Sequence, residues 1–373
     1  MKRTSRIAVF NRVSEPFQLR EVRIPELREG EVLVRIEYTT LCRSDLTTYV
    51  GKRTEKTPTI LGHEIAGTIE EMGAGAPERD ARGDPLKVGD RITWGIYASD
   101  PEGPMARIGI PQKGKDLFKY GHEELTEGSS LHGGLAEHCI LRKHTPIVKI
   151  RKPVPLPVVA LINCSASTAA GALRVAGEVQ DRNVLVSGAG MLGLFACAMS
   201  RAAGARHVLA LDINEERLKM ALRFGADSTF LVEDPEGFSA DTVRQVLGGE
   251  VLHKVMDFSG VPETMEEGLK LLGIGGTAVW IGATFPQRDL LINAEAVIRN
   301  LHTIRGLHNY NESDLVSAVT FIESAYAVYP LEELIHDRFR LDTINEAFRY
   351  GVEANPFRVG VRIEKASENE PKS

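Results

Sequence analysis

The amino-acid sequence predicts an α/β protein of two domains, one mostly β and one built on a doubly wound parallel sheet. Residues 1–150 contain short strand-like runs separated by proline, glycine and charged clusters. From about residue 165, strand-like and helix-like segments alternate instead, a pattern typical of a parallel sheet. A glycine-rich motif, Gly188-x-Gly190-x-x-Gly193, opens this alternating part. With 373 residues, the chain is long enough to form two hydrophobic cores.

The composition is that of an ordinary globular protein, with 43% hydrophobic and 26% charged residues. A formal net charge of −6 argues against a nucleic-acid partner or an anionic membrane surface. No apolar run approaches the roughly 20 residues that a membrane span needs, and the basic N-terminus lacks the apolar core of a signal peptide. We therefore expect a cytoplasmic protein with no membrane partner.

The first domain is expected to span residues 1–164, the second residues 165–306, and residues 307–373 are expected to return to the first. Turn-forming clusters bound the strands that we expect in the first domain, at residues 7–10, 31–38, 65–72 and 90–94. The polar end of the chain, residues 366–373, is expected to be disordered.

In the second domain, residues 183–187 form a short apolar strand that ends in the glycine motif. Leu192, Phe195, Ala196 and Met199 then recur at helical spacing until Gly204. Further strands are expected at residues 207–211, 254–258 and 277–281, with helices over residues 215–224 and from about residue 263. This alternation predicts a parallel, doubly wound sheet.

The glycine motif has the context of a dinucleotide-binding turn, because it follows a predicted strand and opens a predicted helix. Gly188 permits the tight turn, Gly190 lets the backbone approach a pyrophosphate, and Gly193 lets helix and strand pack closely. The N–H groups and the positive dipole end of the helix face the phosphates.

Asp212, at the end of the next predicted strand, is placed to accept hydrogen bonds from the adenosine ribose hydroxyls. A carboxylate there repels a 2′-phosphate, so the sequence favours NAD over NADP. The alternative is that Asp212 only caps the strand end. Met191, Leu192 and Arg217 complete the cofactor-binding residues predicted in this domain.

The four cysteines, Cys42, Cys139, Cys164 and Cys197, include no close pair, so a disulfide framework is not expected. Cys139 and Cys197 are interpreted as inert core residues. Cys42 and Cys164, together with His63, would give two thiolates and an imidazole. Three such ligands are typical of a catalytic zinc site, which keeps its fourth position for water or substrate.

The neighbours of two ligands strengthen this hypothesis. The motif Cys42-Arg43-Ser44-Asp45 places a hydroxyl two residues after a thiolate, where it can hydrogen-bond an alcohol substrate. Glu64 follows His63 directly. Asp45 is a candidate to orient the His63 ring, as metal-bound histidines usually require.

These segments resemble the zinc-dependent alcohol dehydrogenases of the medium-chain dehydrogenase/reductase family, and the resemblance covers nearly the whole chain. It is carried by the Cys42 motif and by three further segments, Leu61-Gly62-His63-Glu64-Ile65-Ala66-Gly67, Gly133-Gly134-Leu135-Ala136-Glu137 and Leu161-Ile162-Asn163-Cys164, together with the nucleotide motif. It implies a GroES-like catalytic domain beside a Rossmann domain, with one catalytic zinc, NAD, and hydride transfer between an alcohol and its carbonyl. Many relatives have glutamate in place of Cys164.

The resemblance also implies roles for individual residues. Ser44 would accept the alcohol proton, Glu64 would lie near the metal and transiently ligate it, and Arg43 and Arg358 would reach the cofactor pyrophosphate. Family members are usually homodimers or homotetramers joined through the edge of the nucleotide-domain sheet. Residues 289–294 are our candidate for that edge.

The chain departs from the family pattern in two places. The four positions that hold a structural zinc in many members are occupied here by Asp100, Gly103, Ala106 and Gly114. We therefore predict no structural zinc. Thr47 stands where several relatives have a histidine that relays the alcohol proton, and threonine does not titrate near neutrality.

The substrate is left open by the sequence. A secondary alcohol, a polyol and a small polar alcohol are all compatible with it. Lys119-Tyr120-Gly121-His122-Glu123 and His132-Gly133-Gly134 resemble a branch associated with phosphonate catabolism, which points to a small polar or anionic alcohol. Two other functions compete: a zinc-free enone or quinone reductase of the same fold, and a nucleotide-binding protein without turnover.

Overall fold

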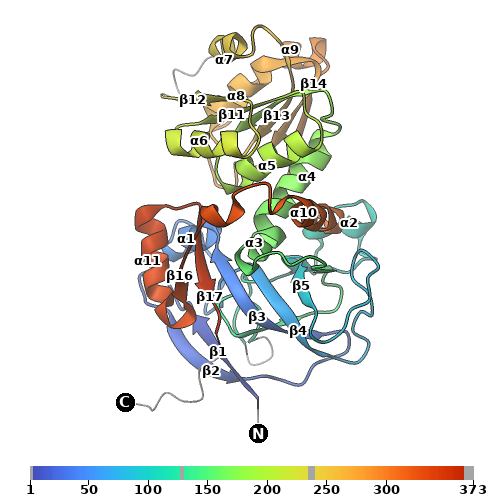
Figure 1. Ribbon diagram of the computed structural model, residues 1–373, viewed down its shortest axis with the longest axis vertical. Coiled ribbons are helices and arrows are strands. Elements are labelled where there is room, and N and C mark those ends of the chain that lie inside the picture. Colours follow the sequence, from blue (N-terminus) through green and yellow to red (C-terminus); the bar gives the residue numbers. More distant parts are fainter. Residues whose placement is uncertain (1–2, 127–129, 234–239, 365–373) are drawn as a thin grey trace. The chain divides into compact units, whose positions relative to one another are not determined.

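A computed structural model of the chain describes residues 3–126, 130–233 and 240–364, which divide into two compact units (Figure 1). Unit 1 consists of Met1–Cys164, Asn311–Tyr326 and Leu331–Ser373, and unit 2 of Ser165–Tyr310 and Ala327–Pro330. The return to unit 1 thus begins at Asn311, later than the predicted residue 307, and is interrupted by four residues that belong to unit 2. The predicted disordered tail lies outside the described residues.

Unit 1 is built on a seven-stranded sheet with the order β16-β17-β3-β4-β5-β9, in which β8 also pairs with β3. Neighbouring strands are antiparallel except β16 and β17, which run parallel. Two small sheets, β1-β2 and β6-β7, complete the β structure. The strands are β1 (Thr4–Val9), β2 (Gln18–Arg23), β3 (Val32–Leu41), β4 (Glu64–Met72), β5 (Arg91–Trp94), β6 (Tyr97–Ala98), β7 (Phe118–Lys119), β8 (His138–Leu141), β9 (Ile147–Lys149), β16 (Ile335–Arg340) and β17 (Arg358–Arg362).

The long central strand β3 explains how this sheet positions a site. Its sequence, VLVRIEYTTL, is rich in β-branched and aliphatic residues and is almost entirely buried. It lies between β17 and β4 and ends directly before Cys42 (Figure 1). Helix α1 (Arg43–Tyr49) begins there, and the Asp45 carboxylate accepts the Cys42 N–H at 2.8 Å, as in a capping box.

Unit 1 also contains helices, several of them short. They are α1, α2 (Pro104–Arg107), α3 (Leu156–Ala160), α10 (Glu312–Ala325) and α11 (Ile344–Ala354), with short helical turns η1 (Pro111–Lys113), η2 (Ile162–Ala166), η3 (Leu331–Leu334) and η4 (Leu341–Thr343). A buried ion pair holds α10 against the loop before β5, with Arg82 Nη1 2.7 Å from Glu323 Oε2. This contact is one reason why the C-terminal return packs on the N-terminal sheet.

Unit 2 contains a six-stranded, all-parallel sheet with the order β12-β11-β10-β13-β14-β15. This is the order of a doubly wound dinucleotide-binding fold, whose switch point lies between β10 and β13. Its elements are α4 (Ser167–Ala176), β10 (Asn183–Ser187), α5 (Met191–Ala202), β11 (His207–Asp212), α6 (Glu215–Arg223), β12 (Ser228–Leu231), α7 (Ala240–Val246), β13 (Leu252–Asp257), α8 (Pro262–Leu271), β14 (Leu272–Trp280), α9 (Ala294–Arg299) and β15 (Thr303–Gly306).

Two expectations from the sequence are wrong. Residues 289–293 form no strand, and the sheet edge on that side is β15, which pairs with β14. A helical run of 21 residues, Leu156–Ala176, is long and apolar enough to pass for a membrane span, although no such run was expected. Most of its apolar window is buried inside the protein, which is the behaviour of a core helix.

His132 is a buried histidine with an unusual environment. It is 1% exposed, neither ring nitrogen has a hydrogen-bond partner among the described residues, and the Phe118 ring lies edge-on to it. Burial lowers the pKa of His132 to about 4, because a charged imidazole would lose its hydration.

We predict that His132 makes the protein less stable in acid. Between pH 6.5 and about 4 the unfolded chain binds a proton at this residue and the folded chain does not, so stability falls as the pH is lowered through that window. The full loss would be roughly 3 kcal/mol. His132→Leu should remove this part of the pH dependence in urea denaturation measured from pH 7 to 4. The control is His144→Asn, at an exposed histidine with φ +67°, a conformation that asparagine tolerates. Parallel pH profiles for wild type and His132→Leu would contradict the prediction.

Candidate metal and cofactor sites

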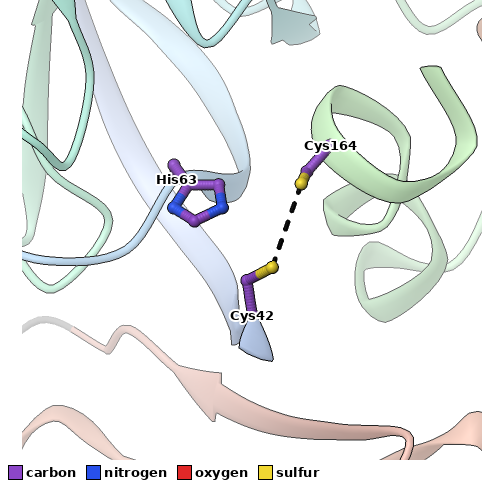
Figure 2. A group of neighbouring side chains, drawn as sticks. All are labelled: Cys42, His63 and Cys164. Carbon is purple, nitrogen blue, oxygen red and sulfur yellow. Dashed lines mark hydrogen bonds between the residues drawn. The ribbon is translucent and has the colours of Figure 1, made fainter. Parts of the chain in front are cut away.

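The three predicted zinc ligands converge within unit 1 (Figure 2). Cys42 follows β3, His63 precedes β4, and Cys164 lies in the turn η2. The two sulfur atoms are 4.0 Å apart, and the ligand atoms of all three residues lie within 4.8 Å of one another. Cys42 and His63 are buried and Cys164 is half-buried. Among the described residues, this is the one group of three or more candidate ligands with such spacing.

Cys164 reaches the other ligands from a π-helical turn, Ile162–Ala166. Such wide turns are rare and often occur at functional sites. The neighbouring Asn163 fixes the turn to the sheet, because its side-chain oxygen accepts the Ile65 N–H at 3.1 Å. Ile65 lies two residues after His63, so one hydrogen bond sets the distance between the second and third ligands.

Asp45 holds the first and second ligands together. One of its carboxylate oxygens accepts the Cys42 N–H, and the other lies 3.3 Å from the Gly62 nitrogen and 3.5 Å from His63 Nδ1. Burial lowers the pKa of His63, but the Asp45 and Cys42 charges raise it well above its ordinary value. With Asp45 on the Nδ1 side, Nε2 is left to face a metal.

Glu64 lies behind the ligands in a buried ion pair. Its two oxygens accept bonds from Arg358 Nε and Nη2 at 2.7 and 3.0 Å, and Thr40 donates to it at 2.5 Å. Arg358 Nη2 is also 3.9 Å from the Cys42 sulfur. The predicted roles of Glu64 as a transient ligand and of Arg358 toward a pyrophosphate stay predictions, and the pairing itself was not anticipated.

The two thiols contact each other, and their pKa values shift in opposite directions. A hydrogen bond with Cys164 and the charges of Arg358 and His63 lower the pKa of Cys42 well below its ordinary value, against the effect of burial. The same hydrogen bond, burial and the Cys42 charge raise the pKa of Cys164. A second thiolate at 4.0 Å therefore needs a cation between the sulfurs. Two thiolates and an imidazole in this arrangement fit zinc.

Residues of α1 line the same region. The Ser44 hydroxyl lies 3.5 Å from His63 Nε2, on the side where a metal and a substrate would bind. Thr47 donates its hydroxyl hydrogen to the Ser44 carbonyl at 2.9 Å. Arg43 is exposed, and its guanidinium donates to the Asn355 side chain just before β17.

Each glycine of the motif in unit 2 has different surroundings. Gly188 has φ +91°, and a Cβ there would lie 2.8 Å from the Ser259 nitrogen. A Cβ on Gly193 would lie 1.9 Å from the Gly188 oxygen, so helix and turn could not pack. Nothing lies within 4 Å of a Cβ on Gly190. No neighbouring atom of the protein therefore explains why position 190 is a glycine. A glycine without such a reason is expected where a ligand approaches the backbone closely.

Asp212 ends β11 beside this turn. Its carboxylate accepts the Ala189 N–H at 2.7 Å and the Asn214 N–H at 2.9 Å, so it fixes the glycine turn to the next loop. Met191 and Leu192 form the first turn of α5, and Arg217 lies in the first turn of α6. The described contacts give Asp212 the capping role that the sequence left open, and its ribose role stays a prediction.

Comparisons with known proteins agree with this geometry. A family model described as "Alcohol dehydrogenase GroES-like domain" matches residues 28–152, and one described as "Zinc-binding dehydrogenase" matches residues 192–324. An alcohol dehydrogenase from Geobacillus stearothermophilus is 30% identical over 354 residues, which cover 91% of this chain and 97% of that protein. The chain belongs to the zinc-binding medium-chain alcohol dehydrogenases.

Other members of this alcohol dehydrogenase family are similarly related. An L-threonine 3-dehydrogenase from Thermococcus kodakarensis is 30% identical, with 89% of this chain and 90% of that protein covered. The crystal structure of an alcohol dehydrogenase from Thermotoga maritima superposes with a TM-score of 0.89 at 26% identity, covering 97% of this chain and all of that one. The predicted GroES-like and Rossmann domains are therefore confirmed. These relatives do not show the phosphonate-associated branch.

Sequence reasoning missed the residues that support the ligands. Thr40 and Asn163 contact the site through hydrogen bonds to Glu64 and Ile65. Asn163 lies within a segment that the sequence had singled out only for Cys164.

We predict that the protein binds one zinc ion per chain at Cys42, His63 and Cys164. Cys42→Ser should lower the zinc content by about tenfold or more, because a hard oxygen replaces a thiolate ligand. Elemental analysis after dialysis measures this. Cys197→Ala is the control, since Cys197 is buried on α5 in unit 2. Full zinc content in Cys42→Ser, or equal loss in Cys197→Ala, would refute the assignment.

Proposed function

We propose that the protein is an NAD(H)-dependent zinc oxidoreductase that interconverts an alcohol and its carbonyl by hydride transfer. The observation that carries this proposal is the convergence of Cys42, His63 and Cys164, with Ser44 beside them. The substrate class proposed is a secondary alcohol, a polyol or a small polar alcohol. We also propose a cytoplasmic location, consistent with four unpaired cysteines.

When bound, zinc supplies Lewis-acid polarisation of the substrate oxygen, and the nicotinamide exchanges a hydride with the adjacent carbon. Cys42, His63 and Cys164 would hold the metal. The Ser44 hydroxyl, which lies 3.5 Å from His63 Nε2, accepts a hydrogen bond from the alcohol and passes its own hydrogen on to water as the alcohol proton leaves. Asp45 keeps the imidazole oriented, and Arg358 compensates the charge of the Cys42 thiolate.

Cofactor choice is proposed to depend on Asp212. Its two oxygens each accept one backbone N–H, which leaves lone pairs for ribose hydroxyls. The same charge would repel a 2′-phosphate, which supports NAD. Gly190, with open space where a side chain would be, supports an approach of the pyrophosphate to the turn.

We propose a homodimer or homotetramer joined at the β15 edge of the unit 2 sheet. The edge strand has no partner on its outer side among the described residues. Three large apolar side chains in the segments next to it are 70–79% exposed, Ile274, Ile298 and Leu301, and the Gly275 N–H to Asn300 carbonyl bond joins these segments. Exposed apolar residues beside an unpaired strand are typical of a surface that another chain covers.

Two other functions remain competitors. A zinc-free enone or quinone reductase would not need Cys42, His63 and Cys164 in ligand geometry. A nucleotide-binding protein without turnover would not need Ser44 beside that geometry. Both are weakened by the same convergence, and activity distinguishes them.

We predict that the enzyme forms NADH from one class of alcohols and that a zinc chelator abolishes this turnover. The panel contains primary and secondary alcohols, polyols and small charged alcohols, each offered with NAD⁺ and with NADP⁺. NAD⁺ should be preferred, and Asp212→Ala should reduce that preference. Turnover that a chelator leaves unchanged would favour the zinc-free reductase, and no turnover with any alcohol would favour the non-catalytic protein.

We predict that Thr47 makes the pH dependence of alcohol oxidation differ from that of a histidine-containing enzyme. Thr47→His should add an ionisation near pH ~6.5, with activity rising as the imidazole loses its proton. The measurement is kcat/KM against pH. Thr47→Val is the control, because it removes the hydrogen bond to the Ser44 carbonyl without adding a titrating group. A profile that Thr47→His leaves unchanged would exclude a relay at this position.

A further inference from the structure

Asp257, the last residue of β13, is a buried carboxylate that has no cationic partner. It is 0% exposed, and three uncharged groups donate to it: the Gly260 N–H at 2.7 Å, the Ser259 hydroxyl at 2.8 Å and the Thr264 hydroxyl at 3.1 Å. No lysine, arginine or histidine forms a salt bridge with it in the part of the chain that the structure describes. Both of its oxygens act as hydrogen-bond acceptors, which is the pattern of an ionised carboxylate.

The absence of a counter-ion distinguishes Asp257 from other buried acids of the protein. Three of these acids are each neutralised by a cation: Glu64 by Arg358 at 2.7 Å, Glu323 by Arg82 at 2.7 Å and Asp90 by Lys149 at 2.8 Å. Burial raises the pKa of Asp257, because the charged carboxylate loses its hydration, and the hydrogen bonds that it accepts oppose this. A buried charge without a counter-ion is costly, so the packing of unit 2 alone does not explain why an ionisable residue stands here.

The loop that Asp257 holds is in contact with the glycine motif. Ser187 and Asp257 pair as the last residues of β10 and β13, and the Phe258 N–H donates to the Ser187 carbonyl at 2.7 Å. A Cβ on Gly188 would lie 2.8 Å from the Ser259 nitrogen, so the first glycine of the motif packs on the backbone after Asp257. β10 and β13 flank the switch point of the sheet, which is where doubly wound folds bind a dinucleotide.

The side of the switch point on which Asp257 lies identifies the part of the cofactor nearest to it. Asp212 ends β11, on one side of β10, and is the residue proposed to bind the adenosine ribose. A dinucleotide spans the switch point, so its nicotinamide half extends past the ends of β13 and β14. The loops after these two strands are in contact, because a Cβ on Gly260 would lie 2.6 Å from the Gly282 carbonyl carbon. The Gly282 N–H donates to the Asp257 carbonyl at 3.0 Å, so the buried carboxylate lies beside both loops.

We propose that Asp257 makes the enzyme bind the oxidised cofactor in preference to the reduced one. Its unneutralised negative charge stabilises NAD⁺, whose nicotinamide ring carries a positive charge, and gives no such stabilisation to NADH, whose ring is neutral. A charge that is shielded from water acts over a longer distance than one at the surface, and Asp257 is fully buried. This inference rests on the proposed function, because that function assigns the cofactor to the switch point of unit 2.

The first test removes the charge without changing the size of the side chain. In Asp257→Asn the amide oxygen can accept the Gly260 N–H and the amide nitrogen can donate to the hydroxyl oxygens, so the loop keeps its hydrogen bonds. Dissociation constants of the holoenzyme for NAD⁺ and NADH are measured by isothermal titration calorimetry. The variant should bind NAD⁺ about fivefold or more weakly, the size of one screened charge interaction, and NADH within about twofold of wild type. An unchanged ratio of the two constants would overturn the inference.

Two control variants separate this charge from the hydrogen bonds and from the net charge of the protein. Ser259→Ala removes a hydrogen bond to the same carboxylate and keeps the charge, so it should change both dissociation constants by the same factor. Asp241→Asn removes a carboxylate whose side chain is 81% exposed on α7, and both constants should equal those of wild type. A shift of the ratio in either control as large as that in Asp257→Asn would contradict the proposal.

Thermal unfolding distinguishes this role from a purely structural one. Without cofactor, Asp257→Asn should unfold at a temperature equal to or above that of wild type, because the substitution removes an unneutralised buried charge. NAD⁺ should raise the unfolding temperature of wild type more than that of Asp257→Asn, and NADH should raise both equally. A lower unfolding temperature of the variant together with equal losses of affinity for NAD⁺ and NADH would show that the carboxylate only holds the loop, and the proposal would be wrong.

The inference and the proposed function fail in different ways. If wild type binds neither NAD⁺ nor NADH, the proposed cofactor is wrong, and the role of Asp257 is wrong with it. If wild type binds both and oxidises an alcohol, but Asp257→Asn binds them in the wild-type ratio, the dehydrogenase function stands and only the role of Asp257 is wrong.

Discussion

The buried ion pair between Glu64 and Arg358 connects the fold of unit 1 to its metal site. Glu64 opens β4 and Arg358 opens β17, and both strands pair with β3, which lies between them. The two charges are 0% and 5% exposed, so the pair is stable only because its geometry is bidentate and Thr40 adds a further hydrogen bond. The same guanidinium lies 3.9 Å from the Cys42 sulfur. The ion pair that joins β4 and β17 across β3 therefore also places a positive charge beside the sulfur of the first ligand.

A second carboxylate, Asp45, connects the first two ligands to each other. It binds the backbone of Cys42 and Gly62 and lies within ion-pair distance of His63. The two acids are not equivalent. Glu64 is neutralised by an arginine, whereas Asp45 balances an imidazole that lies between it and the metal position. Because each carboxylate has its own cationic partner, the two thiol groups and the imidazole lie close together without an unpaired buried charge.

The parallel sheet was predictable from the sequence because its strands are short apolar runs bounded by glycine. β10 has the predicted bounds, and β11 extends the prediction by one residue. Strands β2 and β16 were missed because QLREVR is mostly exposed, IHDRFR is mostly half-buried, and both carry little apolar periodicity. Residues 289–294 were predicted as the sheet edge because their apolar side chains resemble a strand, but β14 pairs with the more polar β15.

The ligands themselves were predictable because each lies in a short local motif. Their supporting partners were not, since Glu64 and Arg358 are 294 positions apart and Ile65 and Asn163 are 98 apart. Such contacts depend on which strands are neighbours and in what register, and no local pattern encodes this. The pairing of Arg358 with Glu64 follows only when β17 is placed beside β3.

The part of unit 1 between β5 and β8 supplies no metal ligand but lies against the loop that carries His63. The family resemblance assigns four positions in this part, Asp100, Gly103, Ala106 and Gly114, to a structural zinc, and none of them is a cysteine. The Asp100 side chain accepts the Glu102 N–H at 2.9 Å, and the Ala106 carbonyl accepts the Gly109 N–H at the same distance.

Two residues in this part contact the second ligand or the loop that carries it. Gly121 lies against the Gly62 carbonyl and His63 Cβ, and the His122 ring packs on the His63 ring with centroids 5.0 Å apart. A side chain at position 121 would therefore displace the loop that carries His63 although the ligand set is unchanged, because its Cβ would lie 2.5 Å from the Gly62 oxygen.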